Sequence, residues 1–259
     1  MDLNRRFAAE APSFLLALQF LTRLPWPSEI AYSDAAMKRS PGWYSAVGLG
    51  IGTLSAVVFG VCALVLPQAV AALIAVSGAL LITGALHEDG FADLCDGLGG
   101  GRGNRERALE IMRDSRIGAF GAIGLGMALA LRVTALAVMP IWAVPFALIA
   151  GGAVSRASMT RAMVGADYVR AQGAGSAVAG DMADAVLQRA LITGAIAALV
   201  CWPFLGFWAG IGGALGLTAA HVVLRRVYEP RLGGYTGDCL GAVQITGEIG
   251  FLVGLLAGM

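Results

Sequence analysis

The chain has 259 residues, of which 58% are hydrophobic and 14% are charged, and its mean hydropathy is +0.75. Soluble domains carry about 25% charged residues, and one soluble core of this size cannot bury so many apolar side chains. The composition therefore excludes an ordinary soluble domain and indicates a membrane protein. The net charge of +1, without a basic stripe, gives no support for a nucleic-acid partner.

The first apolar run, at residues 14–21, is too short to cross a bilayer and is followed by Arg23 and by Pro25-Trp26-Pro27. It lacks the small-residue cleavage site of a signal peptide. Aromatic and charged residues beside a short apolar run are typical of the membrane–water interface. We therefore expect an interfacial or re-entrant segment at the N-terminus.

Seven longer apolar runs approach the ~20 residues that a membrane-spanning helix needs. They predict an all-α fold, a polytopic helical bundle of about seven transmembrane helices that forms a single integral membrane domain over residues 1–259. The predicted spans are residues 47–66, 69–86, 117–138, 142–163, 185–204, 207–224 and 239–257.

Basic residues gather in the N-terminal region and in three long connections, at about residues 88–116, 164–184 and 225–238. The tight turns at Pro67-Gln68 and Pro140-Ile141 carry no charge. If the seven spans alternate in direction, all the basic segments lie on one side, which the positive-inside rule makes cytoplasmic. We therefore expect a multi-pass protein of the cell inner membrane, with these segments inside and the C-terminus outside.

Arg132 lies well inside the third predicted span. A charged group at membrane depth is costly and needs a partner, and Glu248, inside the last span, is the acid available to it. The two residues form either a packing ion pair or, in a transporter, a substrate or proton site.

Asp89, Asp93 and Asp96 follow the second span at positions i, i+4 and i+7, which share one face of a helix. Three carboxylates crowded together repel one another, and a divalent cation removes the repulsion. Mg²⁺ prefers a few carboxylates, water and substrate phosphate. The alternative is a solvated acidic helix start, which the helix dipole favours.

A glycine-rich stretch and a basic stretch come next, and the latter includes Arg102, Arg105 and Arg107. Glycines let a backbone approach a ligand closely, and arginines suit bidentate contact with phosphate. The pattern favours a phosphate clamp, although a solvated helix face is the alternative.

A third motif, Gly-Gly-Tyr-Thr-Gly-Asp at residues 233–238, opens the last span. Asp238 is either the N-cap of that helix or part of the site. Alternation of the spans favours the second interpretation, because it places the motif on the same face as the aspartates.

The stretches HEDGFADLCDGLGGG, ALEIMRDSRIGAFG and GGYTGDCLGA resemble the signatures of the cobalamin synthase family, the adenosylcobinamide-GDP ribazoletransferases. The early ALQFLTRLPWP and PGWYSAVGLGIG runs fit the same pattern, so the resemblance covers nearly the whole chain.

This resemblance implies a membrane-bound, Mg²⁺-dependent transferase that joins α-ribazole, or its 5′-phosphate, to adenosylcobinamide-GDP and releases GMP. Homo-oligomers, or complexes with other enzymes of cobalamin assembly, are further partners that the resemblance allows. The candidate site residues are Glu88, Asp114 and Asp238 as catalytic groups, Arg102, Arg113, Arg116, Arg156, Arg170, Gly234 and Thr236 as substrate-binding groups, and Asp89, Asp93 and Asp96 as metal ligands.

Two rival functions remain. A phosphotransferase of the CDP-alcohol type also uses spaced aspartates and Mg²⁺, but its usual glycine–alanine–arginine spacing is missing. A transporter would use Arg132 and Glu248, but it has no evident need for three aligned aspartates at the end of a span.

Overall fold

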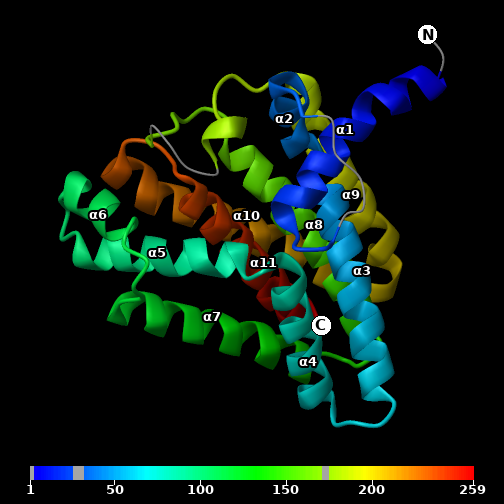
Figure 1. Ribbon diagram of the computed structural model, residues 1–259. Helices are drawn as coiled ribbons and strands as arrows, with labels where there is room; N and C mark the ends of the chain where they lie inside the picture. Colours follow the sequence, from blue (N-terminus) through cyan, green and yellow to red (C-terminus); the bar gives the residue numbers. More distant parts are fainter. Residues whose placement is uncertain (1–2, 26–31, 171–174) are drawn as a thin grey trace.

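The computed structural model describes residues 3–25, 32–170 and 175–259, and within these ranges every regular element is a helix (Figure 1). Trp26 and Pro27 of the predicted interfacial segment, and residues 171–174, lie outside the described residues. The elements are α1 (Leu3–Leu21), α2 (Asp34–Arg39), the 3₁₀ turn η1 (Ser40–Trp43), α3 (Tyr44–Ala63), α4 (Gln68–Thr83), α5 (Leu86–Gly100), α6 (Arg105–Ile111), α7 (Ala119–Val138), α8 (Val144–Ala162), η2 (Ser176–Val178), α9 (Asp184–Leu205), α10 (Phe207–Leu232) and α11 (Gly237–Gly258).

Each of the seven predicted spans coincides with a helix, which confirms the all-helical membrane fold. Within the described residues, however, only five helical segments are long and apolar enough to cross a membrane on their own, or six if the bent pair α4 and α5 forms one span. The number of helices that could each cross a membrane alone is therefore lower than the predicted number of about seven spans. The five segments are Asp34–Ala63, Ala119–Val138, Asp184–Leu205, Phe207–Leu232 and Gly237–Gly258.

Helix α8 explains part of this difference. Its second half carries Ser155, Arg156, Ser158 and Thr160, and all four side chains are buried. A helix that neighbouring helices surround contacts protein rather than lipid, so it needs less hydrophobicity than a lipid-facing one.

The predicted second span does not continue straight to Leu86. Gly84 and Ala85 adopt left-handed backbone angles, with φ of 63° and 55°, and the chain bends by 90° between α4 and α5. Gly84 also lies against the Arg23 guanidinium, where a Cβ would come 2.0 Å from Nε. The segment predicted as a loop from residue 88 is therefore mostly helical, and the aspartates lie on a rigid helix.

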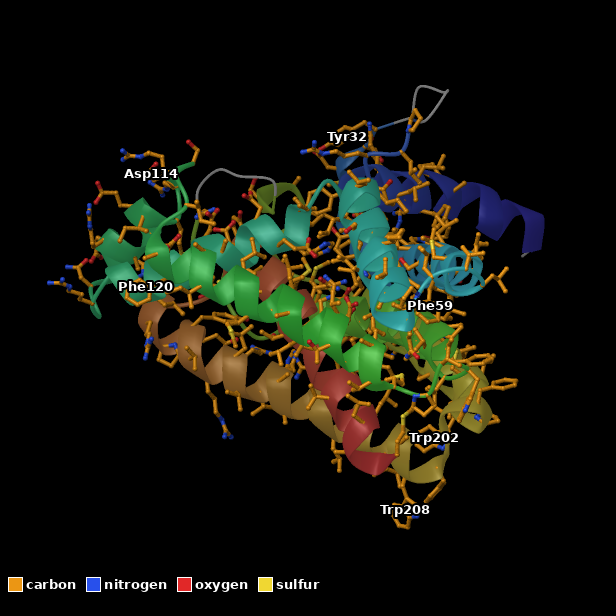
Figure 2. The ribbon with its side chains drawn as sticks, turned by 90° about the horizontal axis from the view of Figure 1, so that it is seen from below. Tyr32, Phe59, Asp114, Phe120, Trp202 and Trp208 are labelled. Atoms are coloured by element: carbon orange, nitrogen blue, oxygen red, sulfur yellow. The ribbon has the colours of Figure 1, made fainter. Side chains whose placement is uncertain are left out.

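Aromatic residues mark one end of the molecule. Trp202, Phe207 and Trp208 surround the turn between α9 and α10, and the last two are 62% and 70% exposed. Figure 2 shows Trp202 and Trp208 at the end of the molecule away from Asp114. Exposed tryptophans are typical of the membrane–water interface, and the charged segments lie at the other end.

Candidate active site

The aspartate helix and the last span touch through glycines. A Cβ added at Gly90 would lie 2.8 Å from the Cα of Asp238, and one added at Gly241 would lie 2.9 Å from the carbonyl oxygen of His87. Such close contacts between helix backbones are possible only where side chains are absent. The two motifs, far apart in sequence, therefore lie side by side on α5 and α11, as we expected from the alternation of the spans.

Thr236, and not Asp238, is the N-cap of α11. The Thr236 hydroxyl accepts a hydrogen bond from the backbone N–H of Cys239 at 3.3 Å, while Asp238 lies in the first turn. The carboxylate of Asp238 is thus free for a different contact, an ion pair of 2.7 Å with the guanidinium of Arg170. Arg170 also donates a hydrogen bond to the carbonyl oxygen of Met112 at 3.0 Å. The cap interpretation of Asp238 is wrong.

A short backbone bridge positions Arg170. Tyr168 pairs with Tyr235, with hydrogen bonds from Val169 N–H to the Tyr235 carbonyl at 3.0 Å and from Tyr235 N–H to the Asp167 carbonyl at 2.8 Å. Gly234 has φ of 150°, and a Cβ there would meet the Asp167 carbonyl oxygen at 2.1 Å. Gly234 is therefore required for the bridge, and the substrate contact expected of it stays a prediction.

Two cavities adjoin the aspartates. One of about 190 Å³ is lined by Asp89, Arg170 and Asp238, together with Tyr168. The other, of about 540 Å³, is lined by Asp89 and Asp93 on one side and by Arg23 on another. Asp89 lines both cavities, so one carboxylate faces two compartments that each also contain an arginine.

The electrostatic surroundings of Asp93 place the carboxylates in one group. The charges of Asp238, Asp89 and Asp96 all act on Asp93, and the charge of Arg170 opposes them. Of the residues predicted from the sequence, the structure thus gathers Asp89, Asp93, Asp238 and Arg170. Arg23 and Tyr168 were not predicted, and only the position of Arg23 at the end of an apolar run could have indicated it.

Asp96 makes a different set of contacts. Its two carboxylate oxygens accept hydrogen bonds from the backbone N–H groups of Gly118 at 2.7 Å and Gly121 at 2.9 Å, at the start of α7. A Cβ at either glycine would collide with this carboxylate. Asp96 therefore neutralises the positive end of the α7 dipole and ties α7 to α5, which run side by side in Figure 1.

These contacts bear on the expected Mg²⁺ site. Among the described residues, no three His, Cys, Asp or Glu side chains converge as a complete metal cage. Mg²⁺ does not require one, because it is usually held by one or two carboxylates, water and substrate phosphate. Asp89 and Asp93 supply such a pair on one helix face beside a cavity, so their donor chemistry fits the ion. Asp96 could join them only by sharing oxygens that already accept backbone hydrogen bonds.

Glu88 and Arg156 belong to a buried cluster, and Glu88 also lines the larger of the two cavities. Arg132 forms ion pairs of 2.9 Å with both Glu88 and Glu248, which confirms the predicted partner and adds a second one. Gln244 donates to Glu248 at 2.7 Å. Together with Arg156, these residues surround a space of only about 20 Å³. The cluster is too small for a substrate, and one oxygen of Glu88 is held by Arg132.

The remaining predicted residues lie on the exposed surface. Arg102 occupies the turn after α5, with φ of 49°, and neither Arg102 nor Arg113 lines the two cavities. Arg116 forms a 2.7 Å ion pair with Asp114, and its hydrogen bonds lower the pKa of Asp114 to about 2. Asp114 is consequently a weak base, although Ser115 beside it reaches the larger cavity.

The fold and the site define a class of protein: a polytopic membrane protein with carboxylates and arginines gathered around cavities at one end of its helices, a combination suited to phosphate chemistry. The family model described as cobalamin-5-phosphate synthase matches residues 13–256, and the chain belongs to this family.

Related proteins align with this chain over almost their full length. A protein of Leptothrix cholodnii is 39% identical over 96% of this chain and 97% of its own. One of Azorhizobium caulinodans is 42% identical over 93% of each chain. Both are named adenosylcobinamide-GDP ribazoletransferase. No solved structure matches the chain.

Proposed function

We propose that this protein is an adenosylcobinamide-GDP ribazoletransferase. It joins α-ribazole, or its 5′-phosphate, to adenosylcobinamide-GDP and releases GMP, giving adenosylcobalamin or its 5′-phosphate. The observation that carries the proposal is the meeting of Asp89 with the Arg170–Asp238 pair across one cavity, in a chain that belongs to this family.

The reaction replaces a phosphoanhydride bond with a phosphate ester bond at the same phosphorus. The ribazole hydroxyl oxygen attacks the phosphorus next to the cobinamide arm, the bond from this phosphorus to GMP breaks, and the hydroxyl proton passes to solvent or to a nearby base. The negative charge of a diphosphate needs cations around it. Arg170 and Arg23 each line a cavity that Asp89 shares, so both guanidiniums are placed to bind phosphate oxygens.

The carboxylates have separate tasks in this proposal. Asp89 and Asp93 hold Mg²⁺, and the ion, when bound, neutralises the diphosphate and the departing GMP. Asp238 orients Arg170 through their ion pair and faces the same cavity, where it can accept a hydrogen bond from a ribazole hydroxyl. Asp96 is a positioning residue that holds α5 against the start of α7.

We also propose that this end of the molecule faces the cytoplasm, in the cell inner membrane. The exposed arginines Arg102, Arg107, Arg113 and Arg116 all lie around α6 at this end, as the positive-inside rule requires. The water-soluble substrates would then reach the cavities from inside the cell.

Purified protein supplied with adenosylcobinamide-GDP, α-ribazole and Mg²⁺ should release GMP. Asp89→Asn should lower the rate at least about 100-fold, because metal charge stabilisation contributes several kcal/mol to such a step. The Asp89→Asn variant should also bind Mn²⁺ more weakly, as measured by paramagnetic resonance without turnover. Asp181→Asn, at an exposed aspartate away from both cavities, is the matched control.

Absence of GMP release, together with turnover of a CDP-alcohol substrate, would identify the rival phosphotransferase. Normal GMP release by Asp89→Asn would remove Asp89 from the metal site but leave the activity itself in place.

A further inference from the structure

A third cavity, of about 640 Å³, lies away from the aspartates, between α8, α9 and α10. It shares no lining residue with the two cavities of the candidate active site. Exposed apolar side chains flank it, including Leu191 and Ile192 on α9 and Val222 and Val223 on α10. The cavity is thus a lateral groove that opens among lipid-facing surfaces.

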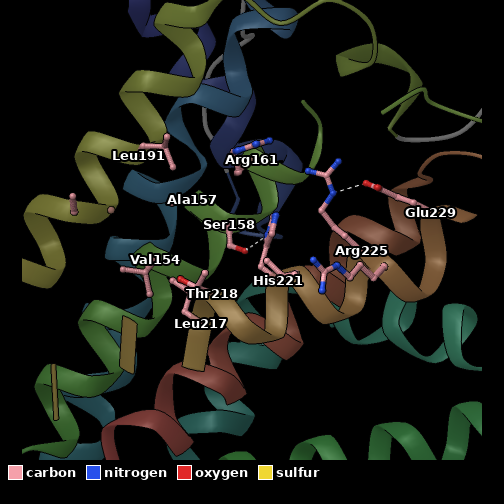
Figure 3. A pocket seen from close by; sticks show the side chains of 14 residues that line it. Val154, Ala157, Ser158, Arg161, Leu191, Leu217, Thr218, His221, Arg225 and Glu229 are labelled. Atoms are coloured by element: carbon pink, nitrogen blue, oxygen red, sulfur yellow. Dashed lines mark hydrogen bonds and ion pairs between the residues drawn. The ribbon is translucent and has the colours of Figure 1, made fainter. Parts of the chain in front are cut away.

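The groove is apolar at one end and basic at the other. Figure 3 shows Val154 and Leu217 at the apolar end and Arg161, Arg225 and Glu229 at the basic end. Arg225 pairs with Glu229. Arg161 and Arg226, both exposed, have no ion pair among the described residues. The basic end therefore carries two guanidinium charges beyond its single carboxylate.

The length of the groove matches half of a bilayer. Leu217 and Arg226 are nine residues apart on one helix, a rise of about 14 Å, and one leaflet contributes about 15 Å of the hydrocarbon core. The basic end also has a defined side. Arg225 donates to the Val164 carbonyl at 3.4 Å, next to the segment that carries Arg170. It therefore lies at the same membrane face as the candidate active site.

We propose that this groove binds an anionic phospholipid of that leaflet, with its phosphate against Arg161 and Arg226 and one acyl chain along the apolar end. Basic pockets between membrane helices bind anionic headgroups in this way. The polar contact inside the groove, between the Ser158 hydroxyl and Nδ1 of His221 at 2.8 Å, satisfies both groups internally. The charge that remains for a ligand is therefore that of the arginines.

The test is lipid retention by the purified, delipidated full-length protein, measured by native mass spectrometry without turnover. Phosphatidylglycerol should bind more tightly than phosphatidylcholine with the same acyl chains. Arg226→Gln and Arg161→Gln should each weaken phosphatidylglycerol binding roughly fivefold. Arg231→Gln, an equally exposed arginine on the same helix outside the groove, should leave it unchanged.

A second pair of variants tests the apolar end without changing charge. Ala195→Trp fills the groove from its rim, whereas Leu199→Trp adds the same bulk to a lipid-facing position of the same helix. Only Ala195→Trp should reduce retention. Equal loss in Arg231→Gln and Arg226→Gln, equal binding of the two lipids, or displacement of the lipid by inorganic phosphate or α-ribazole 5′-phosphate would each overturn the proposal.

Discussion

Two arginines of this protein contact carboxylates on α11, in very different surroundings. Arg132 is 6% exposed, holds both Glu88 and Glu248, and adjoins a space of about 20 Å³. Arg170 is 13% exposed, holds Asp238, and lines a cavity of about 190 Å³. The first arginine has its charge fully matched and no room for a ligand. The second lies where a substrate can reach it. The same kind of contact is therefore enclosed in one place and open to a cavity in the other, where we propose that it binds substrate.

The largest expected effect is on folding, at the buried contact. Arg132→Met leaves two carboxylates buried without their partner, and breaking such a pair from one side costs about 3–5 kcal/mol. The melting temperature in detergent should fall sharply. The double variant that also carries Glu88→Gln should recover part of the loss, because the remaining Glu248 carboxylate still faces the buried Arg156 guanidinium. A melting temperature of Arg132→Met equal to that of the wild type would contradict the structural role.

An intermediate effect, on activity, is expected at the contact between Arg170 and Asp238. Asp238→Asn removes the charge that orients Arg170, and a misplaced binding group costs about 100-fold in rate. Because Thr236 caps α11, the substitution removes no cap and the melting temperature should hardly change. GMP release and thermal melting measured on the same preparation test both statements. Normal turnover would mean that the two arginine contacts do not differ in function.

The smallest expected effect concerns Asp114, which pairs with Arg116 in full contact with solvent. The pKa of Asp114 is lowered to about 2, so its carboxylate is charged at every pH where the protein works. A carboxyl group whose pKa is lowered by folding stabilises the folded protein at pH values above its pKa in the unfolded chain. This contribution to stability is lost only as the pH falls toward 2. Exposed pairs contribute little. The pH–rate profile of Asp114→Asn should therefore keep its shape between pH 5 and 9, measured as GMP release. A lost acidic limb would show that Asp114 is the base.

Patterns along the sequence predicted which residues far apart in the chain lie close together in the fold. The cost of a charge in lipid led from Arg132 to Glu248, and alternation of the spans led from the aspartates to Asp238. Both inferences depend on general properties of the bilayer, so one sequence is enough to make them.

Local backbone geometry was not predictable in the same way. Nothing about Ala85 indicates a left-handed conformation, so the bend before α5 was missed. The Tyr168–Tyr235 bridge joins segments far apart in sequence and has no periodicity to reveal it. The spacing of Asp96 in the sequence is that of a third metal ligand. Its carboxylate instead accepts hydrogen bonds from N–H groups at the start of α7, and only the folded structure reveals this contact.

The helix that carries Asp89 and Asp93 is anchored at both ends. Glu88 holds its first turn to Arg132, and Asp96 holds its far end to the start of α7. A short helix fixed at two points has little freedom left to lose when a ligand arrives. Asp89 and Asp93, the proposed metal ligands, have therefore lost most of their backbone freedom on folding, before any ligand binds. Amide hydrogens between residues 90 and 96 should exchange slowly even without substrate, and substrate binding should add little protection there.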